Sequence, residues 1–246
     1  MINLSQQRAY HKAQLYRLLI KILDDTEIAS SIFFKGGTCS TMLDFLDRFS
    51  IDLDFDLKTE SNKNKLRKRL YKIFDDLNLR IKDESKNALQ FFLLYKAPEG
   101  QRNTIKLEIL DNSFKTINYQ PQYLKDINRM AICQTKESIV ANKLVAITDR
   151  YKKRKTIAGR DVYDIHFFLS HGFNYRKEII EERTNKSVLL YLQELKMFIN
   201  TKITQKIINQ DLNFLLSQEQ FNSIRKTLKI ETLMLINDEI KYLEKK

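Results

Sequence analysis

The segment from Phe49 to Leu57 constrains the fold of this chain more than any other, because its side chains alternate strictly between apolar and polar. Alternation with a period of two predicts a β-strand with one face against a core, since successive side chains on a strand point to opposite faces. The odd-numbered side chains supply the apolar face. The opposite face carries three carboxylates: Asp52, Asp54 and Asp56.

Other segments of the first half predict an α/β arrangement around this strand. Apolar spacing typical of helices occurs around residues 15–22, 38–46 and 63–77, and short apolar or alternating runs predict strands at 31–34, 89–95 and 104–110. The 246 residues include only 5 Gly and 2 Pro, so the chain lacks the turn residues that a many-stranded sandwich or barrel uses. We therefore expect a small α/β domain with a mixed sheet.

Helical patterns dominate the second half of the chain. They cover residues 136–150, 160–169, 177–199, 211–216 and 218–243. The intervening segment 115–135 contains Pro121 and little periodicity, which is typical of a linker. The sequence therefore predicts an α/β domain over residues 1–120, followed by a C-terminal helical domain over residues 121–246.

The charge and the cysteine content bear on partners and location. The chain carries 43 Lys and Arg against 31 Asp and Glu, a formal net charge of +12, which attracts polyanions such as RNA, although a Lys-rich proteome alone also produces such a charge. The longest apolar run, near residues 91–95, is far shorter than the ~20 residues that span a bilayer. With only Cys39 and Cys133 available for disulfides, we expect a cytoplasmic protein with no membrane partner.

The row of aspartates predicts a cation site. Three like charges on one strand face repel one another unless a cation lies among them. Mg²⁺, or Mn²⁺ in its place, suits such a site, because it prefers carboxylate oxygens together with substrate phosphates. The simpler explanation is the solvated face of an edge strand, where aspartate is tolerated. The carboxylates alone do not decide between these two interpretations.

The pair Gly36-Gly37, followed by Thr38, ends the predicted strand at 31–34 and opens a predicted helix. Glycine allows backbone N–H groups to approach a phosphate closely, and the Thr38 hydroxyl can add a hydrogen bond. The segment lacks the Lys-Ser/Thr ending of a P-loop and the third glycine of a dinucleotide fingerprint. It therefore predicts either a phosphate-binding turn or a plain tight turn.

Glu108 offers a further carboxylate. It alternates with the apolar residues of the predicted strand at 104–110, so it points away from the core. If this strand lies beside the aspartate strand, Glu108 joins Asp52 and Asp54 on one surface. Carboxylates arranged in this way hold two metal ions in enzymes that transfer phosphoryl or nucleotidyl groups. Asp111 is the alternative third carboxylate if the register differs.

Four segments together resemble the AbiEii-type nucleotidyltransferase toxins of the DNA polymerase β-like superfamily. Residues 34–38 and 48–56 resemble the family pattern K-G-G-T followed by R-x-S-x-D-[IL]-D-F. Residues 137–146 resemble the family helix with an essential lysine, and residues 160–165 resemble its R-D-x-x-D-[IL] motif. The four segments occur in the family order, which is more specific than any one of them.

The resemblance implies a polymerase β-like core that transfers a nucleoside monophosphate from an NTP to an acceptor hydroxyl. It implies that Asp52 and Asp54 are the metal ligands. The implied nucleotide-binding residues are Lys35, Gly36, Gly37, Thr38 and Lys143. Asp161 and Asp164 complete the implied catalytic set, and the motif does not decide which of the two acts. The family also implies a toxin of a type IV-like toxin–antitoxin or abortive infection system, with an antitoxin as partner.

A run of basic residues lies between the helices that carry Lys143 and Asp161. It predicts a basic loop formed by Lys152, Lys153, Arg154 and Lys155. Such a loop either binds an RNA backbone or is an ordinary solvated loop. The basic charge favours an RNA acceptor, such as the 3′ end of a tRNA. Two alternatives remain: a nucleotidyltransferase that modifies a small molecule, and a non-catalytic nucleotide- or nucleic-acid-binding protein with the same fold.

Overall fold

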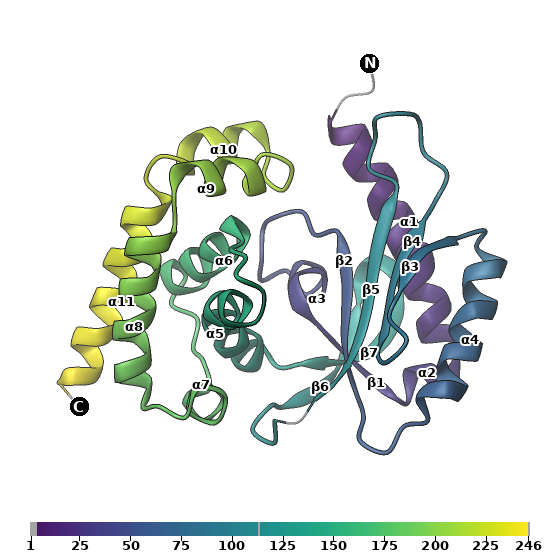
Figure 1. The fold of residues 1–246 in the computed structure, drawn as a ribbon, viewed down its shortest axis with the longest axis horizontal. Coiled ribbons are helices and arrows are strands. Elements are labelled where there is room, and N and C mark those ends of the chain that lie inside the picture. Colours follow the sequence, from purple (N-terminus) through teal and green to yellow (C-terminus); the bar gives the residue numbers. More distant parts are fainter. Residues whose placement is uncertain (1–3, 113, 246) are drawn as a thin grey trace. The chain divides into compact units, whose positions relative to one another are not determined.

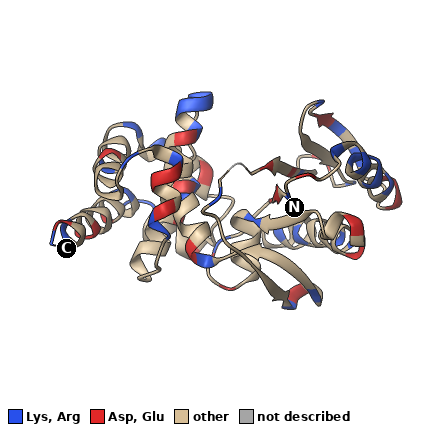
Figure 2. Ribbon diagram, turned by 90° about the horizontal axis from the view of Figure 1, so that it is seen from below, with Lys and Arg blue, Asp and Glu red and all other residues tan. Residues whose placement is uncertain are grey.

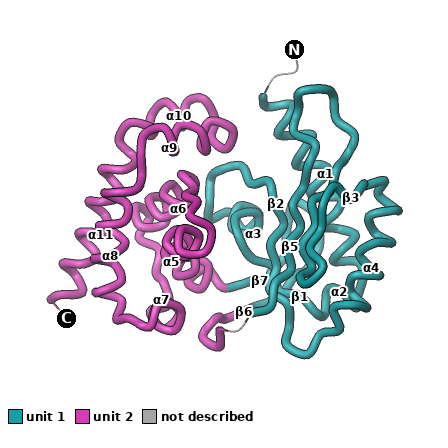
Figure 3. The backbone as a smooth tube through the Cα atoms, viewed as in Figure 1, with its two compact units in different colours: residues 1–113, 119–134 teal, residues 114–118, 135–246 magenta. Residues whose placement is uncertain are grey.

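A computed structural model describes residues 4–112 and 114–245 of the chain (Figure 1). These residues form two compact units, which are described separately (Figure 3). Unit 1 comprises residues 1–113 and 119–134, and unit 2 comprises residues 114–118 and 135–246. The predicted boundary between residues 120 and 121 differs from this division, because both strands that follow residue 118 belong to the sheet of unit 1.

Unit 1 is built on a seven-stranded sheet in the order β3-β4-β5-β2-β1-β7-β6. Its strands are β1 (Ile32–Lys35), β2 (Asp52–Leu57), β3 (Arg80–Glu84), β4 (Leu89–Leu94), β5 (Thr104–Asp111), β6 (Tyr119–Leu124) and β7 (Arg129–Gln134). β2 pairs in parallel with β5 and antiparallel with β1, which itself pairs in parallel with β7. The sheet is therefore mixed, as predicted, and the aspartate strand lies at its centre.

Four helices cover the sheet. They are α1 (Leu4–Asp24), α2 (Thr26–Ala29), α3 (Gly36–Met42) and α4 (Lys63–Asp76). Figure 1 shows α1, α2 and α4 along one face of the sheet and α3 along the other. Leu53 and Phe55 are fully buried, and Phe55 stacks on Phe34 of β1 with ring centroids 5.0 Å apart. The apolar face of the alternating strand thus supplies the core, as the sequence predicts.

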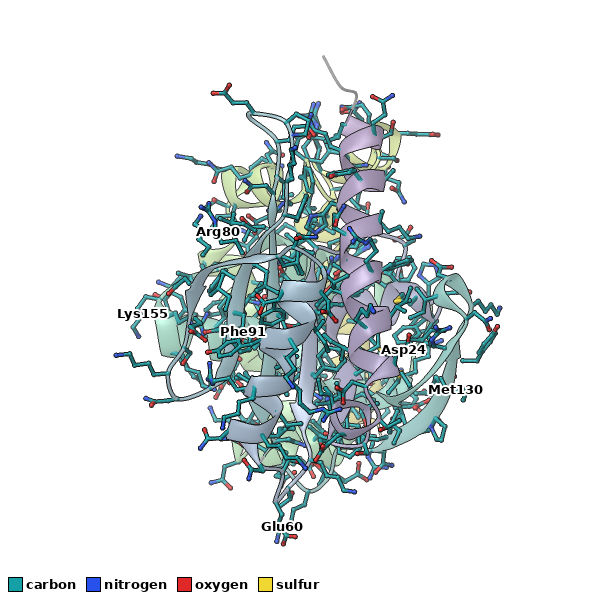
Figure 4. All side chains as sticks on the ribbon, turned by 90° about the vertical axis from the view of Figure 1, so that its right-hand side faces the viewer. Asp24, Glu60, Arg80, Phe91, Met130 and Lys155 are labelled. Atoms are coloured by element: carbon teal, nitrogen blue, oxygen red, sulfur yellow. The ribbon has the colours of Figure 1, made fainter. Side chains whose placement is uncertain are left out.

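Figure 4 views this helix-covered side of unit 1 with its side chains drawn. The labelled Phe91 of β4 lies in the interior, where its ring meets that of Phe74 of α4 at 5.1 Å. The labelled Arg80 and Glu60 lie at the periphery. Burial of large aromatic side chains stabilises the helix layer on the sheet.

Three strands and one helix of unit 1 were not expected from the pattern. The segment 115–135, predicted as a linker, contains β6, β7 and a short 3₁₀ turn at Lys125–Ile127. β6 and β3 are the two edge strands, and their sequences are largely polar because only one side of each is paired. Pro121 fits the edge position of β6, since it has no N–H to donate. The four-residue α2 is too short for a periodic signal.

Unit 2 is helical, as predicted. Its helices are α5 (Lys136–Arg154), α6 (Gly159–Ser170), α7 (Lys177–Thr184), α8 (Val188–Lys202), α9 (Gln205–Leu212), α10 (Gln218–Ile224) and α11 (Leu228–Glu244). The helix predicted over 177–199 is interrupted, because Asn185 adopts the left-handed conformation and Ser187 caps α8. The helix predicted over 218–243 is likewise divided into α10 and α11. Within residues 4–112 and 114–245, no helix is long and apolar enough to cross a membrane.

A buried histidine ties α1 to the start of the aspartate strand. His11 is fully buried, with Nε2 3.0 Å from the carbonyl oxygen of Ile51 and Nδ1 2.7 Å from the hydroxyl of Tyr95. Burial lowers the pKa of His11, although the Ile51 carbonyl opposes this effect. The neutral imidazole is therefore the form that the folded chain favours.

The first prediction concerns acid sensitivity. Below a pH of about 6.5, the unfolded chain binds a proton at His11 that the folded chain resists, so the free energy of unfolding falls as the pH drops towards the lowered pKa. His11→Gln should weaken this fall, because the amide still donates to Ile51 but does not titrate. Urea unfolding at pH 7.5, 6.5 and 5.5 measures the difference, with the exposed His171→Gln as control. Parallel losses in His11→Gln and the unaltered chain would contradict the prediction.

Candidate functional site

The register between β2 and β5 brings the predicted carboxylates together. Asp54 stands directly beside Glu108, and Asp52 stands beside Lys106. The condition under which Glu108 would join Asp52 and Asp54, that strand 104–110 lies beside the aspartate strand, is therefore met. Asp111, the alternative carboxylate, lies beside Leu57 at the far end of the pairing, where it binds Lys63 at 2.5 Å.

Asp56 shares the strand face of Asp52 and Asp54, but its negative charge is already compensated by an ion pair and two hydrogen bonds. Its side chain is 2% exposed. One carboxylate oxygen accepts from the Lys35 ammonium at 2.5 Å, and the other accepts from the Tyr119 hydroxyl at 2.8 Å and the Gln134 amide at 2.6 Å. Asp56 is thus a structural acid. Lys35, which the family resemblance implied for nucleotide binding, is the cation that satisfies it.

Asp54 has a different environment. Burial raises the pKa of its carboxyl, and the charges of Asp52 and Glu108 raise it further. Lys106 and Lys35 oppose this effect through their positive charges. Among the residues that the structure describes, none forms an ion pair with Asp54. A carboxylate held in this way is stabilised by an added cation.

The donor chemistry of this face suits a hard divalent cation. Mg²⁺ is commonly held by one or two carboxylates plus substrate phosphates. In the described part of the chain, no group of three His, Cys, Asp or Glu side chains is arranged to hold a metal ion. The assignment of Asp52 and Asp54 as metal ligands stays a prediction.

The glycine pair is required by the close approach of the aspartate strand. Gly36 has a φ of +80°, and a Cβ atom there would lie 2.6 Å from Oδ2 of Asp54. A Cβ on Gly37 would lie 2.9 Å from the hydroxyl of Ser50 and 3.0 Å from the Arg48 guanidinium. The lack of a side chain thus lets Gly36 lie close to Asp54 and lets Gly37 lie close to Ser50 and Arg48. The helix predicted from Thr38 begins two residues earlier, at Gly36.

Thr38 anchors the helix to the strand. Its hydroxyl donates to the carbonyl oxygen of Asp52 at 2.5 Å and lies 2.9 Å from the hydroxyl of Ser50. The side chain is 4% exposed. The predicted hydrogen bond from this hydroxyl to a phosphate stays a prediction, whereas the observed contact fixes where β2 begins.

Unit 2 contains the remaining predicted residues as two ion pairs between α5 and α6. Lys143 binds Asp164 at 2.7 Å, and Arg150 binds Asp161 at 3.0 Å. Both aspartates are fully buried. Oδ1 of Asp161 has no hydrogen-bond partner within the described residues. Asp164 is therefore the partner of the lysine that the family resemblance singles out, and the catalytic role of either aspartate stays a prediction.

The predicted basic loop is partly helical. Lys152, Lys153 and Arg154 form the last turn of α5, and Lys155 caps it in the left-handed conformation. Basic side chains are favourable at a helix C-terminus, where the helix dipole is negative, so the helix continues through them. All four side chains are exposed. Their positions give α5 a basic end.

The sequence analysis did not identify the side chains that donate hydrogen bonds to the carboxylates of Asp56 and Glu108. Tyr119 and Gln134 come from strands taken as a linker, and Gln90, which donates to Glu108 at 2.5 Å, lies on a separate strand. Their contacts depend on strand order, which the pattern does not contain. The position of Lys106 could have been inferred from the sequence, because residues two apart on a strand lie on the same face and Lys106 is two residues from Glu108.

Two solved structures share the fold. JHP933 from Helicobacter pylori has a TM-score of 0.59 and 22% identity, with 99% of this chain and 96% of that chain covered. MenT4, a nucleotidyltransferase toxin from Mycobacterium tuberculosis H37Rv, has a TM-score of 0.57 and 14% identity, with coverages of 96% and 86%.

The family profile described as nucleotidyl transferase AbiEii toxin, type IV TA system, matches residues 17–232. The chain belongs to the AbiEii nucleotidyltransferase toxin family, so the resemblance found in its motifs is confirmed. No curated protein sequence matches the chain.

The second prediction tests the space beside Asp54. Gly36→Ala should lower both stability and nucleotidyl transfer, because a left-handed conformation costs a non-glycine residue about 1–2 kcal/mol and the new Cβ would also displace Asp54. Gly100→Ala is a matched control, since Gly100 has a φ of +76° but nothing within 4 Å of an added Cβ. Chemical unfolding and a transfer assay on both variants measure the effect. Equal losses in the two variants would show that the approach of Asp54 does not matter.

The third prediction concerns the buried pair of unit 2. Asp164→Asn should destabilise the protein by about 3–5 kcal/mol, because it leaves the Lys143 ammonium buried without its counter-charge. Lys143→Met in the same chain should recover much of this loss, since no uncompensated charge then remains. Urea unfolding of the single and double variants measures both, with the exposed Glu178→Gln as control. A double variant no more stable than Asp164→Asn would contradict this account.

Proposed function

We propose that this protein transfers a nucleoside monophosphate from an NTP to a hydroxyl group of an RNA, such as the 3′ end of a tRNA. The reaction depends on Mg²⁺ or Mn²⁺. The observation that carries the proposal is the juxtaposition of Asp52 and Asp54 with the Gly36-Gly37 turn, where a Cβ atom would collide with Asp54. This combination supports the proposal because Mg²⁺ is commonly held by one or two carboxylates plus substrate phosphates, and glycine lets backbone N–H groups approach a phosphate.

Asp52 and Asp54 are the residues that would hold the metal ion, with Glu108 as the neighbouring third carboxylate. When bound, the ion supplies a lowered pKa at the attacking hydroxyl and neutralises phosphate charge. The protein fixes both aspartates on a central strand. The raised pKa of Asp54 marks the position where a positive charge is most stabilising.

In this proposal the turn that follows β1 binds the nucleotide phosphates. Gly36 and Gly37 let backbone N–H groups approach the phosphates. The turn is held against β2 by two hydrogen bonds: Lys35 donates to the Asp56 carboxylate, and Thr38 donates to the carbonyl oxygen of Asp52. Lys143 binds the triphosphate as a compact positive charge, with its ammonium oriented by Asp164 at 2.7 Å.

The proposal that RNA is the acceptor rests on the basic side chains that have no acidic partner, because these can bind the phosphates of an RNA backbone. Figure 2 shows many basic residues on α4, at the right-hand edge of the view. Four of these residues form ion pairs with acidic side chains of unit 1: Lys63, Lys65, Arg67 and Arg69. Within the described residues, Lys152, Lys153 and Arg154 have no such acidic partner. The basic end of α5 is therefore the surface that we propose for the RNA backbone.

The family description supplies the biological setting for this proposal. The matched family is described as the toxin of a type IV toxin–antitoxin system, which implies an antitoxin as partner. We therefore propose a cytoplasmic toxin of a toxin–antitoxin or abortive infection system.

The fourth prediction tests the reaction directly. Purified protein, Mg²⁺ and each α-labelled NTP in turn should label an RNA band in total cellular RNA. Asp54→Asn should reduce the labelling by at least about 100-fold, since even changes around metal ligands cost ~10–100-fold. Asp111→Asn is the matched control on the same sheet, because Asp111 is 69% exposed at the far end of the β2–β5 pairing.

The outcomes separate the proposal from its alternatives. Labelled RNA from the unaltered chain and from Asp111→Asn, but not from Asp54→Asn, supports it. Label in a small molecule instead of RNA would overturn the proposal that RNA is the acceptor. Binding of Mg²⁺ and NTP without release of pyrophosphate overturns catalysis and indicates a nucleotide-binding protein of the same fold.

A further inference from the structure

A cavity of about 730 Å³ lies in unit 1, between the first two turns of α1 and the loop that joins β4 to β5. Figure 1 shows this loop beside the N-terminal end of α1. The volume falls within the range of about 300–1,000 Å³ that is typical of ligand pockets, and the lining is mainly apolar with a few polar side chains, as in such pockets. Six residues line the cavity: Gln6, Tyr10, Lys96, Ala97, Pro98 and Gln101.

Tyr10 contributes an aromatic ring to the lining. Its hydroxyl donates to the carbonyl oxygen of Lys96 at 2.7 Å, and its ring meets that of Tyr95 edge to face, with centroids 5.8 Å apart. These contacts hold the ring to the loop, yet Tyr10 is 41% exposed. A ring that is fixed before a ligand arrives loses little conformational freedom on binding, which favours affinity.

The polar residues of the lining suit a nucleotide. The amide of Gln101 can both donate and accept hydrogen bonds, as recognition of the edge of a nucleobase requires. Lys96 is exposed and carries a positive charge that can bind a phosphate. Among the described residues that line the cavity, Lys96 is the only charged one. An aromatic ring, an amide and a cation are the groups with which proteins bind unpaired nucleotides.

The cavity lies near the start of the aspartate strand. His11 follows Tyr10 on α1 and lies 3.0 Å from the carbonyl oxygen of Ile51. Ile51 directly precedes Asp52. The last pair of the β4–β5 ladder before the loop stands two positions beyond the row that contains Asp52, about 7 Å along the strands. An RNA chain whose end lies at the aspartates can therefore reach the cavity with a neighbouring nucleotide.

We propose that this cavity binds one unpaired nucleotide of the acceptor RNA, a short distance along the chain from the hydroxyl that reacts. This proposal rests on the proposed function, because it takes the acceptor to be an RNA. The base stacks on the ring of Tyr10 and forms hydrogen bonds with Gln101, and Lys96 binds an adjacent phosphate. Because stacking in the cavity requires an unpaired base, the cavity selects a single-stranded end over duplex RNA.

The fifth prediction concerns RNA binding, measured by fluorescence anisotropy with a short fluorescein-labelled single-stranded RNA of mixed sequence. Tyr10→Ala should weaken binding about tenfold, the loss expected for one stacked base. Tyr10→Phe keeps the ring and should bind as the unaltered chain does. Tyr123→Ala is the matched control and should also bind normally, because Tyr123 is a 50% exposed tyrosine of β6 that likewise donates within unit 1.

Two further readouts separate stacking from charge. The same RNA annealed to its complement should bind equally well to Tyr10→Ala and to the unaltered chain, because its bases are paired. Tyr10→Ala should leave the slope of the logarithm of the binding constant against the logarithm of the salt concentration unchanged, whereas Lys96→Gln should reduce that slope by about 1. In the labelling assay, Tyr10→Ala should raise the KM for RNA and not the KM for the NTP.

The results distinguish failure of this inference from failure of the proposed function. RNA labelling by the unaltered chain together with normal single-stranded binding by a folded Tyr10→Ala would overturn the cavity as a nucleotide site and leave the proposed function intact. Equal losses for single-stranded and duplex RNA would also overturn it. If the unaltered chain labels no RNA, the proposed function fails, and selective loss of single-stranded binding in Tyr10→Ala would still support the cavity as a nucleotide site. Thermal unfolding establishes that each variant is folded, and Gln101→Ala, which alters only the loop, replaces Tyr10→Ala if that variant is not.

Discussion

In the parallel pairing of β2 with β5, Asp54 stands beside Glu108 and two residues from Asp52 on the same face, so like charges meet in a partly buried place. Such an arrangement persists only if cations or donors compensate it. Much of unit 1 supplies this compensation. Lys35, Tyr119 and Gln134 converge on Asp56 from three other strands, while Gln90 and Lys106 converge on Glu108. The order of the strands therefore determines which donor side chains reach each carboxylate.

The glycine pair belongs to the same constraint. A side chain at Gly36 would displace Asp54, and one at Gly37 would meet Ser50 and Arg48. The backbone of α3 can therefore lie against β2 only because these two positions have no Cβ atom. Thr38 then fixes the strand by its bond to the Asp52 carbonyl. The turn, the helix and the aspartate strand are consequently held together by direct contacts, so a change at one of them displaces the others.

The sequence predicted what is local and missed what depends on strand order. Alternation identified β2, β4 and β5 and the carboxylate face, and helical spacing identified α1, α4, α5 and α6. The edge strands β3 and β6 escaped, because a strand with one unpaired side carries few apolar residues, and β6 with β7 moved the boundary of unit 1 to residue 134. The hydrogen-bond partners of Asp56 were also not foreseeable. Its partners come from positions 35, 119 and 134, which only the folded sheet brings together.

Three acids of the site region, Asp56, Glu108 and Asp54, differ in how their charges are compensated. Asp56 is saturated by one lysine and two neutral donors, so it has no capacity left for a ligand. Glu108 has one oxygen occupied by Lys106 and Gln90. Asp54 forms no ion pair with a described residue, and burial together with the neighbouring carboxylates raises the pKa of its carboxyl. Because Asp56 and Glu108 already have a lysine partner, an incoming cation would be stabilised most at Asp54, beside the glycine turn.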